Sequence, residues 1–156
     1  DLGVACGLAF ATDGTLYVGD RSGTIFCVDR HGHADAFASV PSSIAAFHLA
    51  VSPDGRVYVS GPTLSSYDAV YCIDRDGSVT ERYTRFGRPQ GLAFDREGSL
   101  LVVDALAGSS GLYRLPAEGA PDLVLSGPGL LGVALDPGGG LIVCSNETVY
   151  RLPRPT

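Results

Sequence analysis

The sequence predicts an all-β fold, a β-propeller built from four-stranded antiparallel blades, and three observations support this prediction. An apolar run, a glycine-centred turn and a second apolar run recur four times within the 156 residues. The copies begin 41, 43 and 41 residues apart, measured at Leu8, Leu49, Leu92 and Val133, and about 40 to 45 residues is the length of one blade. Glycine is frequent, at 21 residues, and no helical period is sustained, which argues against repeats of helix pairs.

We expect one propeller domain over residues 1–156, because this length and an apolar fraction of 45% suit a single domain with its own core. The repeats are 7–47, 48–90, 91–131 and 132–156, and the last lacks its outer strand. The first residues of the chain are too few to supply that strand. We therefore expect an upstream segment or a second chain to complete a larger ring; a self-contained four-bladed ring is the alternative.

The first strand of each repeat carries alanine between two larger apolar residues. Since side chains alternate across a strand, one face is bulky and the other presents only a methyl group, which suits stacked sheets that need different clearances. A hairpin turn follows each first strand. The triplets are Leu8-Ala9-Phe10, Leu49-Ala50-Val51, Leu92-Ala93-Phe94 and Val133-Ala134-Leu135, and the turns are Asp13-Gly14, Asp54-Gly55, Glu97-Gly98 and Gly138-Gly139.

The second strand is apolar without alternation, which is typical of a strand buried on both faces. We expect it at 16–18, 57–59, 100–103 and 141–143. A third strand is expected at 24–28, 69–73, 111–115 and 148–152, followed by a tight turn at 29–32, 74–77 and 116–119. A more polar fourth strand, at 33–40, 78–86 and 120–126, suits the outer edge of a blade, because polar side chains discourage edge-to-edge pairing.

Charge and composition exclude several classes of partner. The net charge is −6, from 11 basic and 17 acidic residues without a basic cluster, so we expect no nucleic-acid binding. No apolar run approaches the roughly 20 residues that span a bilayer, so we expect no membrane insertion. The four cysteines form no CxxC pair, which argues against a zinc–cysteine site and leaves their redox state and the compartment open.

In a four-stranded meander the short glycine turns lie on one face, and the other loops lie on the opposite face. We call this second face the variable-loop face, because its loops differ in length and sequence between the repeats. Its loops are 19–23, 60–68, 104–110 and 145–147, and its links between blades are 41–47, 87–90 and 127–131. Variable loops on a rigid scaffold often carry function, so we expect the ligand site on this face.

Several polar residues should surround the mouth of the central channel on the variable-loop face. Asp20 and Asp104 end their second strands at the same repeat position. As a pair facing the channel they could hold a cation or act as acid and base; alternatively, each accepts hydrogen bonds from its own loop amides. The residues expected at the mouth are Cys6, His48, Gln90, Asp20, Ser60, Asp104 and Ser145.

His48 replaces the glycine found at its position in the other repeats. It is a candidate general base or metal ligand, and the alternative is a wall residue with satisfied hydrogen bonds. The catalytic candidates are thus His48, Asp20 and Asp104, and the metal-ligand candidates are Asp20, Gln90 and Asp104. No nucleophile motif or phosphate loop is present. Contacts to a ligand are expected from Asp20, Arg21, His48, Ser60, Gln90, Asp104 and Asn146.

The pattern Gly-Leu-Ala-Phe-x-x-x-Gly-x-Leu-x-Val-x-Asp at 91–104, followed by a third strand and Asp-x-x-Gly in other copies, resembles the NHL repeat. It is also similar to the senescence-marker-protein, gluconolactonase and luciferin-regenerating-enzyme propellers. The resemblance implies a ring of usually six blades and, in the lactonases, a divalent cation such as calcium on the channel axis. In those lactonases, an Asn and an Asp that come just before the Gly-apolar pair of a first strand are among the ligands of the cation. The residues at the matching positions here are Cys6, Phe47, Gln90 and Leu131, and among them only Gln90 has an oxygen suited to a hard cation.

These observations support three hypotheses about function. The leading one is a binding or interaction module of this propeller type, which recognises a small molecule or a peptide at the variable-loop face. The second is a metal-dependent hydrolase of lactones or similar esters, in which calcium or zinc polarises the carbonyl and activates water. The third is a segment of an extracellular or envelope repeat array without a ligand of its own.

Overall fold

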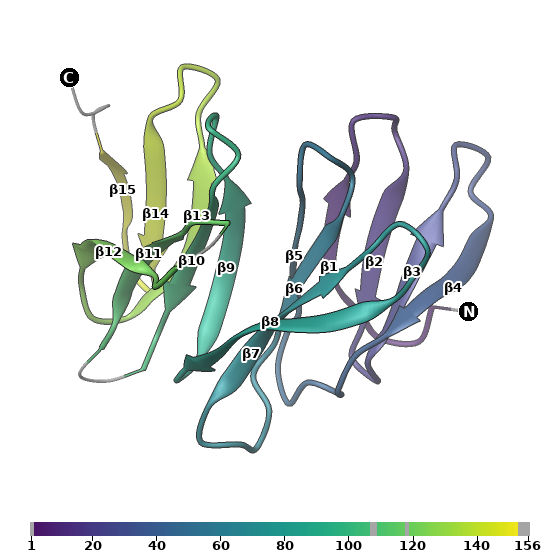
Figure 1. Cartoon of the computed structure of the whole chain (residues 1–156), viewed down its shortest axis with the longest axis horizontal. Coiled ribbons are helices and arrows are strands. Elements are labelled where there is room, and N and C mark those ends of the chain that lie inside the picture. Colours follow the sequence, from purple (N-terminus) through teal and green to yellow (C-terminus); the bar gives the residue numbers. More distant parts are fainter. Residues whose placement is uncertain (1, 107–108, 118, 153–156) are drawn as a thin grey trace.

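The computed structural model describes residues 2–106, 109–117 and 119–152, which form fifteen strands and no helix (Figure 1). Blade 1 contains β1 (Ala5–Phe10), β2 (Leu16–Asp20), β3 (Thr24–Val28) and β4 (Ala34–Ser39). Blade 2 contains β5 (His48–Val51), β6 (Val57–Ser60), β7 (Asp68–Ile73) and β8 (Val79–Phe86). Blade 3 contains β9 (Pro89–Phe94), β10 (Leu100–Asp104), β11 (Gly111–Leu115) and β12 (Asp122–Ser126). Blade 4 contains β13 (Leu130–Leu135), β14 (Leu141–Ser145) and β15 (Val149–Leu152).

Each blade is an antiparallel meander in which the order of the strands in space equals their order in the chain. The first strands β1, β5, β9 and β13 contact one another in turn, so the four blades follow one another in an arc (Figure 1). This arrangement confirms the predicted fold class, a β-propeller made of four repeats. The meander also separates the short glycine turns, at one end of the strands, from the variable loops at the other end.

The bulky and small faces of the first strands are used as predicted. Leu49 packs in the core between blades 1 and 2, whereas its neighbour Ala50 packs in the core between blades 2 and 3. Leu92 of blade 3 shares that second core with Ala50, and Ala9 of blade 1 shares the first core with Leu49. A bulky side chain therefore faces the preceding blade, and an alanine faces the following one.

The second strands of the two inner blades supply much of the core. Every residue of β6 and β10 is buried, as expected for strands covered on both faces. Val59, Leu101 and Val102 are fully inaccessible to solvent, and burying a side chain of this size stabilises a fold by about 1.5–3 kcal/mol relative to exposure. Strands β2 and β14 are buried only in part, because within the described residues blades 1 and 4 have a neighbour on one side only.

Blade 1 exposes an apolar face on the side away from blade 2. Leu8 is 64% exposed, whereas Leu49 and Leu92, at the same repeat position, are each 8% exposed against a preceding blade. Phe10 lies on the same face of β1 as Leu8 and is also largely exposed. Blade 4 lies at the far end of the arc from blade 1, and its Val149 is exposed (Figure 1). The described residues therefore form an open arc with two uncovered ends.

The links between blades are shorter than the sequence predicted. The sequence predicts links at 87–90 and 127–131 and a first repeat that begins at Gly7, but the inner strands begin earlier, at Ala5 in β1, Pro89 in β9 and Leu130 in β13. The cause is a β-bulge in each strand, because one extra residue lets the strand continue past its glycine. The strand then pairs with the end of the second strand, through Ala5–Asp20, Pro89–Asp104 and Leu130–Ser145.

Blade 2 has no such bulge. Strand β5 begins at His48, which pairs directly with Ser60. A Cβ atom at Gly7 would lie 2.3 Å from the carbonyl oxygen of Phe47, and one at Gly91 would lie 2.7 Å from Cα of Gly132, so these two glycines permit a close approach of neighbouring inner strands. Position 48 differs from the glycine positions 7 and 91, because the imidazole of His48 fits between blades 2 and 3, where it contacts Gln90.

An ion pair recurs between the first turn and the third strand of blades 3 and 4. In blade 3, Arg114 Nε lies 3.1 Å from Oδ2 of the buried Asp95. In blade 4, Arg151 and Asp136 form the equivalent pair at 2.5 Å. Both arginine side chains are exposed, that of Arg151 more than that of Arg114.

Cysteines occupy this third-strand position in the other two blades. Cys27 is half-buried and Cys72 is buried, and both are free thiols. Cys6 and Cys144 are also free and half-buried. Burial raises the pKa of the Cys27 thiol, and the charge of Asp35 raises it further.

Some expected features lie outside the described residues. They are residue 1, residues 107–108 of the loop 104–110, Glu118 of the turn 116–119, and the last residues of the fourth repeat, 153–156. Within the part of the chain that the structure describes, no segment forms a helix of the length and apolarity that a bilayer crossing requires.

Candidate functional site: the channel mouth and a rim pocket

Asp20, the last residue of β2, is buried, and its carboxylate is held by groups of its own surroundings. Oδ2 accepts a hydrogen bond from the amide of Val4 at 2.5 Å, and Oδ1 accepts one from the amide of Ser22 at 2.9 Å and another from the Ser22 hydroxyl. The hydrogen bond from the Ser22 hydroxyl has the largest effect on the pKa of Asp20, and together with the bonds from the amides it holds this pKa below its ordinary value. The carboxylate therefore fixes the loop between β2 and β3.

Asp104 has the same function at the end of β10. Its Oδ2 accepts a hydrogen bond from the amide of Gly87 at 3.1 Å, and its Oδ1 accepts bonds from the amides of Arg88 and Leu106 at 2.7 and 3.3 Å. The buried carboxylate thus ties the link before blade 3 to the end of the second strand. Both aspartates follow the second interpretation given above, in which loop amides satisfy the carboxylate.

His48, Ser60 and Gln90 come together at the start of the inner strands of blades 2 and 3. His48 Nε2 lies 3.2 Å from Gln90 Oε1, and the hydroxyl of Ser60 donates a hydrogen bond to the backbone carbonyl of Gln90 at 2.6 Å. Burial lowers the pKa of His48, and the hydrogen bond with Gln90 partly opposes this effect. At neutral pH the imidazole is uncharged and donates its Nε2 proton to the glutamine oxygen.

The residues predicted as metal ligands do not fit a divalent cation. The oxygens of Asp20 and Asp104 are surrounded by N–H and O–H donors, and the side-chain oxygen of Gln90 faces His48. Calcium requires six to eight oxygen ligands that converge on one point. No group of three or more His, Cys, Asp or Glu side chains that could hold an ion occurs among the described residues.

The remaining predicted site residues have other hydrogen-bond partners or are exposed. Arg21 is exposed and donates a hydrogen bond to the carbonyl of Ile44 at 3.0 Å, so it supports the link between blades 1 and 2. Asn146 is exposed in the turn between β14 and β15. Cys6 directs its thiol toward the carbonyl of Gly19, at 3.6 Å.

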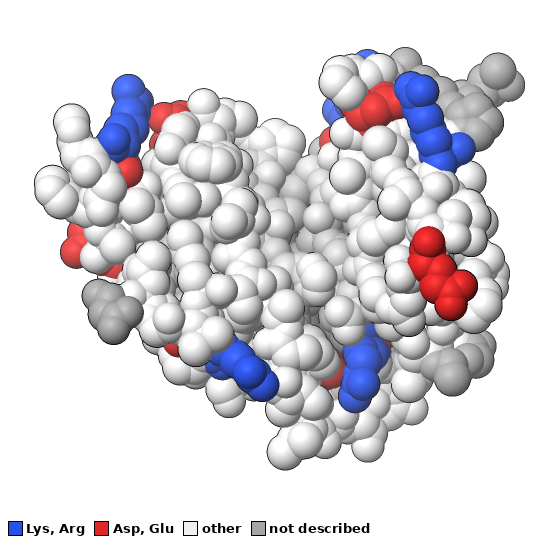
Figure 2. All heavy atoms as spheres, turned by 180° about the vertical axis from the view of Figure 1, so that it is seen from behind, with Lys and Arg blue, Asp and Glu red and all other residues white. Residues whose placement is uncertain are grey.

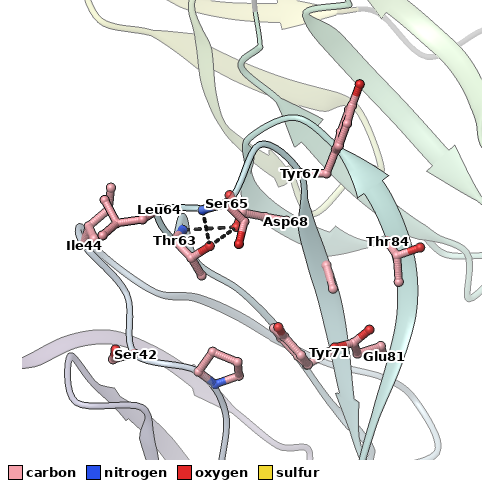
Figure 3. Close-up of a pocket in the computed structure, with 12 residues that line it drawn as sticks. Ser42, Ile44, Thr63, Leu64, Ser65, Tyr67, Asp68, Tyr71, Glu81 and Thr84 are labelled. Atoms are coloured by element: carbon pink, nitrogen blue, oxygen red, sulfur yellow. Dashed lines mark hydrogen bonds between the residues drawn. The ribbon is translucent and has the colours of Figure 1, made fainter.

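A pocket of about 550 Å³ lies nearer the rim, between the link 41–47 and the loop 60–68, and its floor includes strands β7 and β8 (Figure 3). The sequence identified both segments as variable loops but did not predict that they meet around a cavity. The lining residues used below are Ile44, Thr63, Tyr67, Asp68, Tyr71 and Glu81.

Hydrogen bonds hold the two loops of this rim pocket together. The hydroxyl of Ser43 and the amide of Ile44 both donate to the carbonyl of Pro62, at 3.0 and 2.9 Å. Within the second loop, Asp68 Oδ1 accepts hydrogen bonds from the amide and the hydroxyl of Thr63, at 3.1 and 2.6 Å. Figure 3 shows this closure of the loop on Asp68 at the start of β7. The walls of the pocket are therefore fixed by hydrogen bonds between and within the loops.

Sequence reasoning missed Asp68 and the rim pocket. The sequence places Asp68 at the end of a variable loop, and nothing in the composition of the sequence distinguishes its carboxylate from the other sixteen acidic side chains. A local signal was present, because Thr63 and Asp68 flank the loop and such residue types commonly close loops through side-chain hydrogen bonds.

Figure 2 shows the molecule from behind the view of Figure 1. On this face, arginine and acidic side chains are interspersed around the margin, and the hollowed centre between the two halves shows no charged side chain. Nucleic-acid phosphates are bound by clustered basic side chains, and this face has no such cluster.

Comparison with solved structures shows β-propellers of related architecture. Virginiamycin B lyase from Staphylococcus aureus aligns with 100% of this chain and 57% of its own, at a TM-score of 0.74 and 16% identity. A gluconolactonase from Xanthomonas campestris aligns with 92% of this chain and 57% of its own, at a TM-score of 0.71 and 23% identity. The calcium-binding protein regucalcin from Agrobacterium tumefaciens aligns with 92% of this chain and 55% of its own, at a TM-score of 0.70 and 18% identity.

These similarities confirm the expected resemblance at the level of the fold. The chain spans a little over half the length of each of these three propellers. Their names describe a lyase, a lactonase and a calcium-binding protein, so the shared fold does not define one chemistry. No protein-family model and no curated protein matches the sequence.

Proposed function

We propose that the chain is a binding module of the gluconolactonase-like propeller type, which takes a small molecule or a peptide side chain in the rim pocket. The observation that carries this proposal is that the pocket lies between two variable loops fastened to each other through Pro62. Ligand pockets are usually preformed and measure about 300–1,000 Å³. A preformed cavity lowers the entropy lost when a ligand binds.

The composition of the pocket wall also supports binding. Ile44 and Tyr67 offer exposed apolar and aromatic surface, and Thr63, Asp68 and Glu81 offer a few polar groups that could orient a ligand. The aspartates at the channel mouth are engaged by loop amides, so the ligand contacts predicted there are replaced in this proposal by contacts at the rim.

A thermal-shift screen against a library of small metabolites and capped tripeptides tests this function. We expect ligands whose stabilising effect is lost in Ser65→Trp, which fills the pocket, and retained in Ser66→Trp. Ser65 lines the pocket, whereas Ser66 is its exposed neighbour in the same loop and is outside the lining. Ligands that respond equally to both substitutions would contradict binding at this pocket.

A metal-dependent hydrolase of lactones or similar esters, with calcium or zinc, is the second candidate. One observation favours it, since an uncharged His48 at the channel mouth could accept a proton. The poor fit of Asp20, Gln90 and Asp104 to a cation argues against it. Hydrolysis of δ-gluconolactone by the purified chain, dependent on added calcium or zinc and lost in His48→Gln, would support the hydrolase; equal rates in both proteins would contradict it.

We also propose that further propeller blades, from an additional segment or a second chain, cover the exposed face of blade 1. Leu8 and Phe10 occupy positions that other repeats bury against a preceding blade, which supports this proposal. Native mass spectrometry of the chain should detect self-association or a complex with an added fragment, weakened by Leu8→Ser and Phe10→Ser together. A monomer whose behaviour is unchanged by these substitutions, with or without the fragment, would contradict it.

A further inference from the structure

The charged side chains that line the rim pocket are all acidic. Asp68 and Glu81 are the charged residues of its lining, which includes no arginine or histidine. Three other pockets of the described chain are each lined by two arginines, for example Arg96 and Arg114 between blades 3 and 4. Arg21 donates to the carbonyl of Ile44 but is not part of the lining. The linings of those pockets also include acidic residues, whereas the rim pocket has acidic residues without a basic one, and such a lining attracts cations.

Asp68 is 4% exposed, and only one of its carboxylate oxygens is satisfied. Oδ1 accepts both hydrogen bonds from Thr63, whereas the buried Oδ2 has no hydrogen-bond partner among the described residues. Leaving a buried acceptor without a donor is unfavourable, and more so for a charged group. A ligand that brings a donor to Oδ2 would supply the hydrogen bond that Asp68 lacks.

Two tyrosines border these carboxylates. Tyr71 pairs with Glu81 across strands β7 and β8, and Tyr67 is exposed at the pocket rim. Burial raises the pKa of Tyr71, and the negative charges of Glu81 and then Asp68 raise it further. Aromatic faces attract organic cations through the cation–π interaction.

We infer that the rim pocket recognises an organic cation, an ammonium or guanidinium group, through Asp68 and Glu81, with Tyr71 as an aromatic wall and Tyr67 at the rim. This inference rests on the proposed binding function and names the ligand class of the same pocket. A carbon-bearing cation fits better than a metal ion, because the two carboxylates do not form a cluster with a third acidic or metal-binding side chain among the described residues. The apolar surface of Ile44 suits the carbon part of such a ligand.

The experiment compares cations with neutral molecules of the same shape. The probes are methylguanidinium against N-methylurea, and the capped peptide Gly-Arg-Gly against its Gly-citrulline-Gly counterpart. Dissociation constants come from NMR titrations of the chain. We expect each cation to bind at least about tenfold more tightly than its neutral counterpart, because a charge-assisted hydrogen bond is the stronger kind. Tighter binding of the arginine peptide than of methylguanidinium would identify a peptide as the source of the cation, and equal affinities would identify a small molecule.

Two variants test the named carboxylates. Asp68→Asn should weaken binding of methylguanidinium about tenfold or more, and Glu81→Gln should weaken it about two- to fivefold, as expected for an exposed charge. Asp122→Asn is the matched control, since Asp122 is exposed on β12 and does not line the pocket. If Asp68→Asn unfolds the loop, the affinity of the Glu81→Gln protein for methylguanidinium still tests the inference, because Glu81 is exposed.

Two kinds of failure can be distinguished. Equal binding of cationic and neutral probes, or unchanged cation affinity in Glu81→Gln, would overturn this inference and leave the binding function standing. Absence of binding by every probe and by every library member would overturn both.

Discussion

The Nε2 atom of His48 lies 3.2 Å from the Oε1 atom of Gln90, and this contact joins the beginnings of the inner strands of blades 2 and 3. The two residues meet because Gln90 lies in the bulged part of β9, while β5 starts at His48 without a bulge. A histidine that replaces a repeat glycine thus forms part of the packing between two blades.

The stability of the chain should depend on the protonation of His48. The unfolded residue binds a proton at its ordinary pKa of 6.5, whereas burial lowers the pKa in the folded state. Between these two values the unfolded chain binds more protons, so the free energy of unfolding should fall as pH drops below about 6.5, by at most about 1.4 kcal/mol per pH unit. Urea unfolding at pH 7.5, 6.5 and 5.5 measures this change.

His48→Gln should flatten that dependence between pH 7.5 and 5.5. The control is a double variant, His31→Gln with His33→Gln, because these two histidines are exposed. An equal pH dependence in the His48→Gln protein and the wild type would show that His48 is not its source.

Substitution at one repeat position should reduce the free energy of unfolding by different amounts in two blades. Leu92→Ala should reduce the free energy of unfolding by about 2–5 kcal/mol, because it leaves a cavity in the core between blades 2 and 3. Leu8→Ala, at the same repeat position, should cost less than about 1 kcal/mol, because this side chain is largely exposed. Chemical denaturation of both variants gives the comparison, and losses of similar size would contradict the open arc.

The two recurring ion pairs should contribute unequally. Arg114→Ala should destabilise the fold by about 1–3 kcal/mol, because it leaves the buried carboxylate of Asp95 without its counter-charge. Arg151→Ala should cost less than about 1 kcal/mol, because that arginine is 74% exposed and solvent can replace it. Thermal unfolding of the two variants tests the order, and a larger loss for Arg151→Ala would reverse it.

The sequence predicted the fold because each level of organisation repeats. Alanine between two larger residues, the hairpin turn and the apolar second strand recur in every blade, so tertiary packing and local pattern agree. The bulges could not be predicted, since they depend on how β1, β9 and β13 pair with their second strands. Their effect was to move Gln90 from an expected link into a strand.

The rim pocket could not be predicted from the sequence for a different physical reason, because it depends on contacts between segments that are distant in the chain. Ser43 and Pro62 are 19 residues apart, and they meet only in the folded chain, where the link 41–47 lies against the loop 60–68. The unsatisfied oxygen of Asp68 is likewise a property of the folded loop and of its burial. The sequence identified the correct loops as variable, but it could not show that two of them enclose one cavity.

The most direct test of the account is to map where the capped peptide Gly-Arg-Gly binds, by following the backbone amide signals of the chain in an NMR titration. If the peptide binds in the rim pocket, the amide signals of Ile44, Thr63, Ser65 and Tyr67 should shift together with one dissociation constant. Shifts confined to His48, Ser60 and Gln90 would contradict it, because they would place the ligand at the channel mouth instead of the rim pocket.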